Sequence, residues 1–572
     1  MKIQQGSRHA LACVALHFAC LAQTGAAMAA TGEDAGAGSR PDAAAAQHAD
    51  AGTHAHARAH AQEQLASLRL ELDPTAPVWI VTADSTWRGL AAVSKQIAVD
   101  ATLTRDSLGT PLRIAKIQAG QLSRVSAFVH QRELRCGGYF AFRSQAEAEA
   151  FVREERSAQA VAPKLLATYT IDNRTTVDPW LPQVQHTNIY TTINTLSAYQ
   201  NRYYTSADGK ASAEWIRSRW QALAGTRTDV TSELSTCANC STQPSVILTV
   251  RGNELPNEIV VLGAHLDSIT SSGGGSTTQR APGADDDASG IATLTEVIRI
   301  ALANGWKPKR TVKFIGYAAE EVGLRGSNAI AQAHKAAGAN VHAVLQLDMT
   351  NYRSGGADMR LITDYSSADL KTFLTSLFDT YLAPLGLTRG TYTCGYGCSD
   401  HASWTSAGYP AGMMFEGGAS GYFTSIHTQN DTLANMGNSA QNSAKFAKLG
   451  LAFLGEAAKT AGSGGGGGGS TEVLNLVLPN VARSAWSPTY PVTIPAGTTR
   501  LVVATSGGSG DADLYVRLGA APTTTTYTCR PYLSGSNETC TIDNPTVGAT
   551  YFIAVRAYSA ISGVTLKATR TP

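Results

Sequence analysis

The chain has 572 residues, which is long for one domain and predicts roughly two to four of them. Its 46 Lys and Arg residues nearly balance its 44 Asp and Glu residues, and the formal net charge of +2 creates no long-range field of one sign. This balance argues against a nucleic-acid partner, while the 43% of hydrophobic residues supply enough apolar material for a core.

Residues 1–29 have the three parts of a secretory signal peptide. Lys2 and Arg8 make the start basic, residues 10–22 are mainly apolar, and Ala27 and Ala29 are small residues where a signal peptidase cuts. The apolar run is too short to span a membrane, and no later stretch reaches about 18 apolar residues. We therefore expect a secreted, extracellular protein without a membrane segment. A cytosolic N-terminal helix is the alternative, which the three-part pattern disfavours.

Two segments precede the main domain. Residues 30–66 are rich in Ala, Gly, Asp and His without periodicity, which is typical of disorder. In residues 67–165, strand-like patches such as Val78 to Val81 alternate with helical ones such as Gln145 to Glu154, so we expect a small α+β domain. Its position suggests the propeptide of a zymogen, acting as an intramolecular chaperone for folding or as an inhibitor.

The main domain is expected over residues 168–461. Residues 259–262, 312–315 and 343–347 are short apolar runs that suit buried strands, and apolar residues recur at helical spacing over residues 291–301. This alternation predicts an α/β fold, with a mostly parallel or mixed sheet flanked by helices. Ligand sites in such sheets form at the carboxyl ends of the strands.

A second domain is expected at the C-terminal end. Residues 462–470 are only Gly and Ser, which is typical of a flexible linker. Residues 471–572 contain short β-rich runs, such as Leu501 to Ala504 and Tyr551 to Val555, between Gly- and Asp-rich turns. We expect a β-sandwich of the jelly-roll type that serves secretion, stability or substrate attachment and is dispensable for the chemistry.

The nine cysteines can be sorted by segment. Cys13 and Cys20 belong to the signal peptide and Cys136 to the expected propeptide. The other six form three close pairs, which in an exported protein favour local disulfides: Cys237–Cys240, Cys394–Cys398 and Cys529–Cys540. Half a zinc site at the first pair is the alternative, but no second pair lies at zinc-ribbon spacing.

Histidine and acidic residues follow the expected strands. His265 and Asp267 are two residues apart, so in an extended segment they face the same way and Asp267 can orient the His265 ring. Three consecutive carboxylates at 285–287 repel one another, a cost that a bound cation or a helix dipole can offset. The adjacent Glu320 and Glu321 can point to different places, one to a metal and one to its water.

Asp348 and His427 complete a set of five candidate ligands, two His and three Asp or Glu, plus one spare Glu. Imidazole and carboxylate ligands without thiolates suit zinc, and also manganese or cobalt. Two such ions sharing a carboxylate and a water would produce a hydroxide nucleophile near neutral pH. The sequence has no Gly-x-Ser-x-Gly elbow, no His-Glu-x-x-His helix and no phosphate-binding loop.

These motifs, in this order, resemble those of the secreted bacterial leucyl aminopeptidases, which are zinc exopeptidases with two co-catalytic zincs. The resemblance covers about Thr168 to Ala461 and is carried by residues 263–268, 281–290, 318–327, 347–349 and 426–428. Residues 507–516, Gly-Gly-Ser-Gly-Asp-Ala-Asp-Leu-Tyr-Val, resemble the bacterial pre-peptidase C-terminal domain.

The resemblance implies a role for each residue. One zinc would be held by His265, Asp286 and Asp348, and the other by Asp286, Glu321 and His427, with Asp286 as the bridging carboxylate. Glu320 would be the general base, Asp267 would orient His265, and Tyr396 would hydrogen-bond the tetrahedral intermediate from a loop held by Cys394–Cys398. Met413, Met414, Phe415 and Tyr422 would line the pocket for the first side chain of the substrate, or would be core residues.

The implied function is that of a metallo-aminopeptidase, a hydrolase that removes N-terminal, preferentially hydrophobic Leu-like residues from peptides with a free N-terminus. We expect a monomer with two Zn²⁺ ions, for which Co²⁺ or Mn²⁺ could substitute. A glutaminyl-peptide cyclase-like transferase with one zinc and a non-catalytic peptide-binding protein are the alternatives, which the complete ligand set and Glu320 disfavour. A carboxypeptidase would need a basic residue for the substrate carboxylate, and Arg325 and Arg353 keep that hypothesis open.

Overall fold

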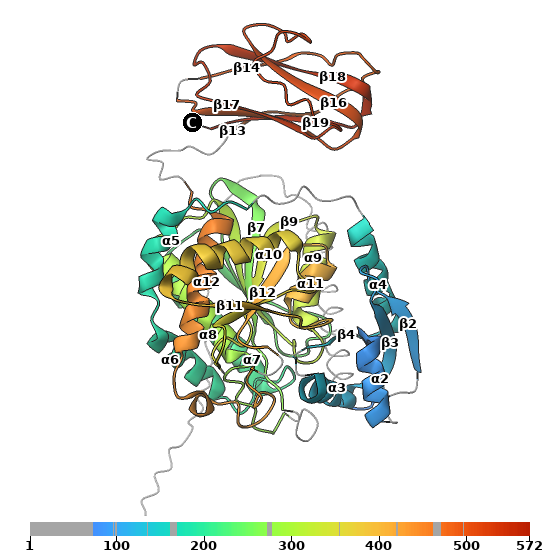
Figure 1. Cartoon of the computed structure of the whole chain (residues 1–572), viewed down its shortest axis with the longest axis vertical. Coiled ribbons are helices and arrows are strands. Elements are labelled where there is room, and N and C mark those ends of the chain that lie inside the picture. The colour runs from blue at the N-terminus through green and yellow to red at the C-terminus, as the bar shows by residue number, and fades with distance from the viewer. Residues whose placement is uncertain are drawn as a thin grey trace, which may run out of the picture. The chain divides into compact units, whose positions relative to one another are not determined.

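The computed structural model describes residues 73–571 apart from gaps at 95–96, 98–99, 134, 136, 161–168, 271–276, 354, 419–420, 462–470 and 496. The predicted signal peptide, low-complexity segment and Gly/Ser linker, as well as Cys13, Cys20 and Cys136, lie outside the described residues. Three groups of elements follow one another along the chain (Figure 1). We call them the N-terminal domain (73–160), the α/β domain (169–461) and the C-terminal domain (471–571).

The N-terminal domain has the α+β fold that the sequence predicted. Its antiparallel sheet has the order β2-β3-β1-β4, and helices pack on it. Successive residues of a strand face opposite sides, so Ile80 and Val81 enter two different apolar clusters, and both faces of the sheet are buried. The elements are β1 (Pro77–Ala83), α2 (Asp84–Val93), β2 (Asp100–Arg105), β3 (Pro111–Gln118), α3 (Leu122–Phe128), the π-turn η2 (Val129–Glu133), β4 (Tyr139–Phe142) and α4 (Gln145–Ala160).

An eight-stranded mixed sheet forms the centre of the α/β domain. Its order is β11-β10-β12-β9-β7-β8-β6-β5, and β12, β9, β7 and β8 run parallel to one another. The predicted strands 259–262 and 312–315 fall within β7 and β8, and the predicted strand 343–347 overlaps β9, so the predicted α/β fold is confirmed. The strands are β5 (Val230–Ser235), β6 (Ser245–Val250), β7 (Leu255–His265), β8 (Arg310–Tyr317), β9 (Asn340–Gln346), β10 (Met359–Ile362), β11 (Arg389–Tyr392) and β12 (Ala411–Phe415).

Helices cover both faces of this sheet, as Figure 1 shows for α8 and α12 on one side and α9 and α11 on the other. The largest apolar cluster lies under α8, where the predicted helical positions Ile291, Leu294 and Val297 are fully buried. The helices are α5 (Arg174–Trp180), α6 (His186–Ser197), α7 (Ala207–Ala224), α8 (Ala288–Ala303), α9 (Arg325–Ala336), α10 (Ala368–Leu377), α11 (His401–Ser406) and α12 (Gln441–Ala458).

The C-terminal domain consists of two antiparallel sheets that share one apolar core. Their strand orders are β13-β19-β15-β17 and β14-β18-β16, and the core contains only residues of this domain. This is the predicted β-rich fold. The strands are β13 (Thr471–Val477), β14 (Tyr490–Thr493), β15 (Arg500–Ser506), β16 (Ser509–Leu518), β17 (Glu538–Asp543), β18 (Thr550–Ser562) and β19 (Thr565–Thr571).

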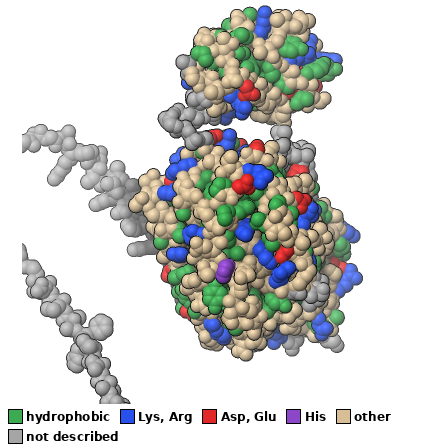
Figure 2. Space-filling model, turned by 60° about the vertical axis from the view of Figure 1, so that its left-hand side comes forward, with side chains coloured by type: hydrophobic (Ala, Val, Ile, Leu, Met, Phe, Trp, Pro, Cys, Tyr) green, Lys and Arg blue, Asp and Glu red, His purple; other side chains and the backbone are tan. Residues whose placement is uncertain are grey.

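Three disulfides join the cysteine pairs that the sequence favoured: Cys237–Cys240, Cys394–Cys398 and Cys529–Cys540. On the face drawn in Figure 2, acidic and basic side chains are interspersed among uncharged ones, as the near-zero net charge leads us to expect. Across the described part of the chain, no helix combines the length and hydropathy needed to cross a bilayer.

Candidate metal centre and substrate pocket

The predicted ligands meet at the carboxyl ends of the parallel strands. His265 is the last residue of β7, Asp348 follows β9, and Glu321 follows β8. Asp286 comes from the turn that precedes α8, and His427 comes from the loop after β12. The carboxyl ends of parallel strands meet at one edge of a sheet, so side chains more than 150 residues apart in sequence converge there.

These five side chains form two groups of three that share Asp286. The Nε2 atom of His265 lies 2.9 Å from Oδ1 of Asp286 and 3.6 Å from Oδ1 of Asp348. On the other side, Nε2 of His427 lies 3.1 Å from Oδ2 of Asp286 and 2.8 Å from Oε2 of Glu321. Each oxygen of Asp286 thus faces a different histidine, which is the arrangement of a carboxylate that bridges two cations.

The electrostatics of the site favour cations. All five side chains are buried. Burial alone lowers the pKa of the His427 imidazole, but the carboxylates of Glu321 and Asp286 outweigh it and raise that pKa to about 10. Asp348, Asp267 and Asp286 likewise raise the pKa of His265 well above its usual value, against burial. Because the carboxylates raise the pKa of both buried histidines, the site stabilises positive charge.

The donor atoms fit divalent metal ions. Both carboxylate oxygens of Glu320, Oε1 of Glu321 and Oδ1 of Asp348 are buried and lack hydrogen-bond partners among the described residues. Such groups are costly unless a ligand or ion pairs with them. Two imidazoles with carboxylates and no thiolate match zinc, and also cobalt or manganese.

Asp267 has a wider role than the sequence predicted. Its Oδ1 atom lies 3.5 Å from Nδ1 of His265, on the side where it can orient the ring. The same carboxylate also accepts hydrogen bonds from the backbone N–H groups of Glu320 (3.0 Å) and Glu321 (3.1 Å). One side chain therefore positions a ligand on β7 and the two glutamates after β8.

The three consecutive aspartates have separate partners. Asp286 faces the histidines, while Asp287 caps α8 by accepting from the N–H of Gly290 (2.8 Å). Asp285 accepts from the N–H of Asn351 (2.9 Å). The N–H groups of Asp285 and Asp286 themselves donate to Asp431, which fixes the turn.

Sequence analysis missed Asp431 and two further supporting residues. Ser399 Oγ donates to Oδ2 of Asp348 at 2.6 Å, opposite the ligand atom. The fully buried guanidinium of Arg202 donates to the carbonyls of Leu266 and Gly283, which joins the loop after β7 to the turn before α8. Arg202 and Asp431 lie in no motif, and the segment that contains Ser399 does not indicate which residue Ser399 contacts.

Three residues at this edge of the sheet have a strained backbone. Ala319, Met349 and His427 have positive φ angles of 55°, 52° and 56°, although none of them is glycine. Each costs on the order of 1–3 kcal/mol and persists only where the surrounding structure enforces it. All three residues belong to ligand-bearing loops.

One buried apolar cluster contains the three residues predicted to contact the first side chain of the substrate. Met413, Phe415 and Tyr422 belong to one buried cluster, together with Met349, Phe423 and the Cys394–Cys398 disulfide. Met414, which the sequence also suggested for the pocket, instead enters the main core, because successive residues of β12 face opposite sides of the sheet.

Comparison with known proteins identifies the fold and its activity. The family model for peptidase family M28 matches residues 245–452. A probable leucine aminopeptidase of Arthroderma otae is 36% identical over 270 residues, which cover 46% of this chain and 71% of the relative. Leucine aminopeptidase 1 of the same organism is 35% identical over 316 residues, which cover 53% of this chain and 82% of the relative. The chain belongs to peptidase family M28.

A solved structure supports the same assignment. The crystal structure of the LapA aminopeptidase of Legionella pneumophila matches with a TM-score of 0.55 and 27% identity, covering 67% of this chain and 99% of that one. The model of the bacterial pre-peptidase C-terminal domain matches residues 487–557. This M28 chain is therefore a metallo-aminopeptidase, a hydrolase that acts on peptides, and the resemblance found in the sequence is confirmed.

The N-terminal domain of this M28 chain contacts the candidate centre directly. The buried ring of His130, in η2, lies 4.8 Å from the ring of His427 and 5.6 Å from that of Tyr422, measured between centroids. The Tyr422 hydroxyl donates to the His130 carbonyl at 3.3 Å, and Ser126 Oγ donates to the carbonyl of Glu321 at 2.8 Å. This domain therefore contacts a candidate ligand, His427, and a residue predicted for substrate binding, Tyr422.

Tyr396, which was predicted to act at the metal centre, instead faces the N-terminal domain. Its ring packs in a cluster made mainly by the N-terminal domain, 5.7 Å from Phe140 and 5.4 Å from Tyr365 between centroids. The ionisable neighbours that influence its hydroxyl are Glu155, Tyr365 and Asp106, and none of these belongs to the two groups of ligands.

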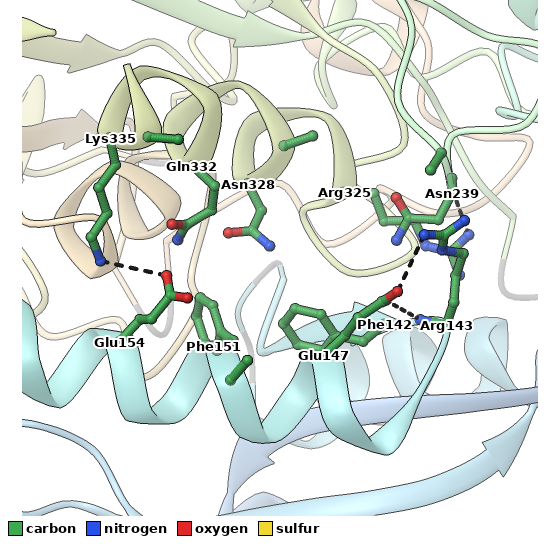
Figure 3. Close-up of a pocket in the computed structure, with 14 residues that line it drawn as sticks. Phe142, Arg143, Glu147, Phe151, Glu154, Asn239, Arg325, Asn328, Gln332 and Lys335 are labelled. Atoms are coloured by element: carbon green, nitrogen blue, oxygen red, sulfur yellow. Dashed lines mark hydrogen bonds and ion pairs between the residues drawn. The ribbon is translucent and has the colours of Figure 1, made fainter. Parts of the chain in front are cut away.

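A cavity of about 620 Å³ lies between α4 and α9 (Figure 3). Phe142 and Phe151 form its apolar side, while Glu154 lies 3.7 Å from Lys335 across it. Its lining holds neither histidine nor cysteine, and it is separate from the two groups of ligands. We therefore interpret it as a feature of the interface between α4 and α9.

Proposed function

We propose that this M28 aminopeptidase removes N-terminal, preferentially hydrophobic, Leu-like residues from peptides in the extracellular medium, with two zinc ions and Glu320 as the general base. The observation that carries the proposal is the pair of ligand groups that share Asp286. His265 and Asp348 would complete one ion's ligands, and Glu321 and His427 those of the other. Bound there, the ions would polarise the scissile carbonyl and lower the pKa of a water molecule.

Glu320 suits the role of general base. It is buried beside the ligands, and burial raises the pKa of its carboxyl well above the usual value. A base with a raised pKa can accept a proton from the attacking water and return it to the leaving amine near neutral pH. The hydrogen bond from its N–H to Asp267 holds the loop that carries it.

Specificity is proposed to come from the apolar pocket. Met413, Phe415 and Tyr422 offer a buried apolar lining next to His427, which suits a branched or unbranched aliphatic side chain. A pocket of this kind discriminates by roughly 1–3 kcal/mol per methylene, so we expect preference for leucine and not exclusivity. Tyr396 is proposed to donate a hydrogen bond to the tetrahedral intermediate.

The flanking segments are proposed to control export and latency. Residues 1–29 would be a signal peptide, and residues 67–165 a propeptide that assists folding and inhibits the enzyme until it is removed. The contact of His130 with His427 and Tyr422 supports inhibition, because a substrate needs the same space. Residues 168–461 would form the catalytic domain and residues 471–572 an accessory domain, in a protein that acts as a monomer.

The decisive experiment uses the chain freed of its N-terminal domain. Leucine p-nitroanilide and N-acetyl-leucine p-nitroanilide are each incubated with and without a chelator, and zinc is then titrated back. We expect cleavage of the free-amine substrate alone, abolished by chelation and restored at two zinc ions per chain. Cleavage of the acetylated substrate would contradict recognition of a free amine. Inactivity of the metal-loaded chain on both substrates would favour a glutaminyl-peptide cyclase or a peptide-binding protein.

A further inference from the structure

The position of Tyr396 sets it apart from every other residue proposed for catalysis. Its side chain is 3% exposed and belongs to an apolar cluster whose other members come mostly from the N-terminal domain. Phe140 of β4 and Phe151 of α4 are among them. We call this cluster the tyrosine socket; its members from the N-terminal domain are Val81, Ala83, Leu112, Ile114, Phe140, Phe142, Ala148, Phe151 and Val152.

The N-terminal domain also forms hydrogen bonds with the backbone of the loop that carries Tyr396. Arg135 Nη1 donates to the Tyr396 carbonyl at 2.7 Å, and the N–H of Gly138 donates to the Gly397 carbonyl at 2.7 Å. The two backbones approach so closely that a Cβ atom at Gly137 would collide with the Gly397 carbonyl oxygen. Contacts to both backbone and ring hold the loop in one conformation.

The socket does not use the hydroxyl group that distinguishes tyrosine from phenylalanine. Tyr396 Oη is buried and lacks a hydrogen-bond partner among the described residues. The acidic residues near it, Glu155 and Asp106, both come from the N-terminal domain. A buried hydroxyl without a partner is unfavourable, so phenylalanine would fill this position better. A role for the hydroxyl in a second position of the side chain would account for tyrosine at this site.

The loop is built to offer that second position. The Cys394–Cys398 disulfide closes its base within the buried cluster that contains Met413, and the next residue, Ser399, donates to Asp348. Between these fixed points, Gly395 and Gly397 flank Tyr396 with φ angles of 100° and 63°, in the region that glycine adopts freely. The N–H groups of Cys394 and Gly395 donate to Asp364 at 2.9 and 2.7 Å, so the base of the loop stays with the α/β domain. The backbone freedom of Gly397 lets the tip of the loop turn relative to that base.

From these contacts we propose that the N-terminal domain keeps the enzyme inactive by storing Tyr396 in the tyrosine socket, and that release of the domain lets the loop carry the hydroxyl to the metal centre. The inference rests on the proposed function, in which Tyr396 stabilises the tetrahedral intermediate. It adds a second block to the one at His130. Release also removes the apolar surroundings of the ring, which favours its packing elsewhere.

Two tyrosines of the α/β domain provide a matched pair for the first test. Tyr365 also faces the N-terminal domain, but its hydroxyl donates to Asp106 Oδ2 at 2.9 Å and lies 3.1 Å from Thr110 Oγ1. The full chain, with a specific protease sequence inserted between residues 160 and 169, is cut to give a complex of the two parts. Dissociation of this complex is followed on dilution, and the released enzyme is assayed on leucine p-nitroanilide.

The two variants should behave in opposite ways. Tyr396→Phe should dissociate no faster than the unsubstituted complex, whereas kcat of the released enzyme falls roughly 100-fold with KM nearly unchanged, the usual effect of losing one such donor. Tyr365→Phe should dissociate roughly 10-fold faster, through loss of hydrogen bonds across the interface, with kcat unchanged. Faster dissociation of the Tyr396→Phe complex would show that the hydroxyl is used in the socket, and would overturn the inference.

The second test follows the ring itself. Fluorotyrosine is placed at position 396, Co²⁺ is bound in the centre, and the ¹⁹F relaxation caused by the paramagnetic ion is measured before and after release of the N-terminal domain. We expect a large increase on release for the label at 396 and none for a control label at 365. Unchanged relaxation at 396 in an active enzyme would overturn the inference alone. Failure of the released chain to bind cobalt or to cleave the substrate would overturn the proposed function, and this inference with it.

Discussion

Glu155 makes the affinity of the N-terminal domain for the α/β domain dependent on pH. This residue of α4 is 5% exposed and accepts a hydrogen bond from Ser406 Oγ of α11 at 3.4 Å. Burial, reinforced by Asp106 and opposed by Ser406 and Lys335, raises the pKa of its carboxyl from the usual 4.5 to about 7. The contact with the α/β domain therefore favours the neutral acid over the carboxylate.

The size of the effect follows from that shift. Below pH 4.5 the acid is neutral in the bound and the free domain, so its full contribution to binding is present. As the pH rises toward 7, the free domain loses the proton first, and the contribution is lost as the pH passes through 7. A shift of this size amounts to about 3 kcal/mol, an upper limit of roughly 300-fold in the dissociation constant.

The assay uses the cut complex described above, diluted at pH values from 5 to 8. We expect the dissociation constant of the unsubstituted complex, divided by that of the Glu155→Gln complex, to rise with pH, because an amide does not ionise. His130, whose pKa is lowered to about 3 by burial in the same interface, adds an opposite pH dependence to both complexes and cancels in this ratio. Glu149→Gln, an exposed substitution on the same helix, is the matched control and should keep the original pH dependence. If Glu155→Gln kept that dependence as well, the reasoning would be refuted.

Three further outcomes follow from the site and the domains. Glu320→Gln should lower kcat roughly 10²–10⁴-fold. Its zinc content should stay unchanged, since Glu320 belongs to neither ligand group, and loss of zinc in metal analysis would contradict its role as general base. Asp267→Asn should weaken zinc binding roughly 10–100-fold, because the amide cannot replace both acceptor oxygens of the carboxylate. The affinity is measured in competition with a chromophoric chelator, and an unchanged value would count against the positioning role of Asp267. Deletion of residues 471–572 should leave specific activity on leucine p-nitroanilide nearly unchanged, because that domain has its own core, and a large loss would assign it a part in catalysis.

The ligands could be predicted from the sequence because each lies in a short motif, either after an apolar strand or, for Asp286, just before a helix. His265 and Asp348 could be placed at one edge of the sheet from strand order alone. Asp431 and Ser399 could not, since each acts on a residue far away in the chain and lies in no motif of its own. The alternation along β12 did carry a usable signal, and it would have assigned Met414 to the core.

The position of Tyr396 was beyond sequence analysis for a different reason. Its motif identifies a loop, but the direction of the ring depends on packing against a domain more than 230 residues earlier in the chain. The same holds for His130, which is one buried histidine without a motif. Contacts between domains depend on the shapes of two folded surfaces, and local periodicity does not encode them.

One apolar cluster is built jointly by two domains, and this affects the lifetime of the enzyme. Ile80 and Val125 of the N-terminal domain pack in it with Ala318, Ala319 and Val322, which surround the proposed base. The loop that carries Glu320 is thus completed by a partner that the proposed processing discards. A mature molecule that unfolds would have no template from which to rebuild that loop, so its survival depends on how slowly it unfolds rather than on its equilibrium stability. Each molecule would fold only once, so natural selection would favour mature enzymes with a high activation barrier to unfolding.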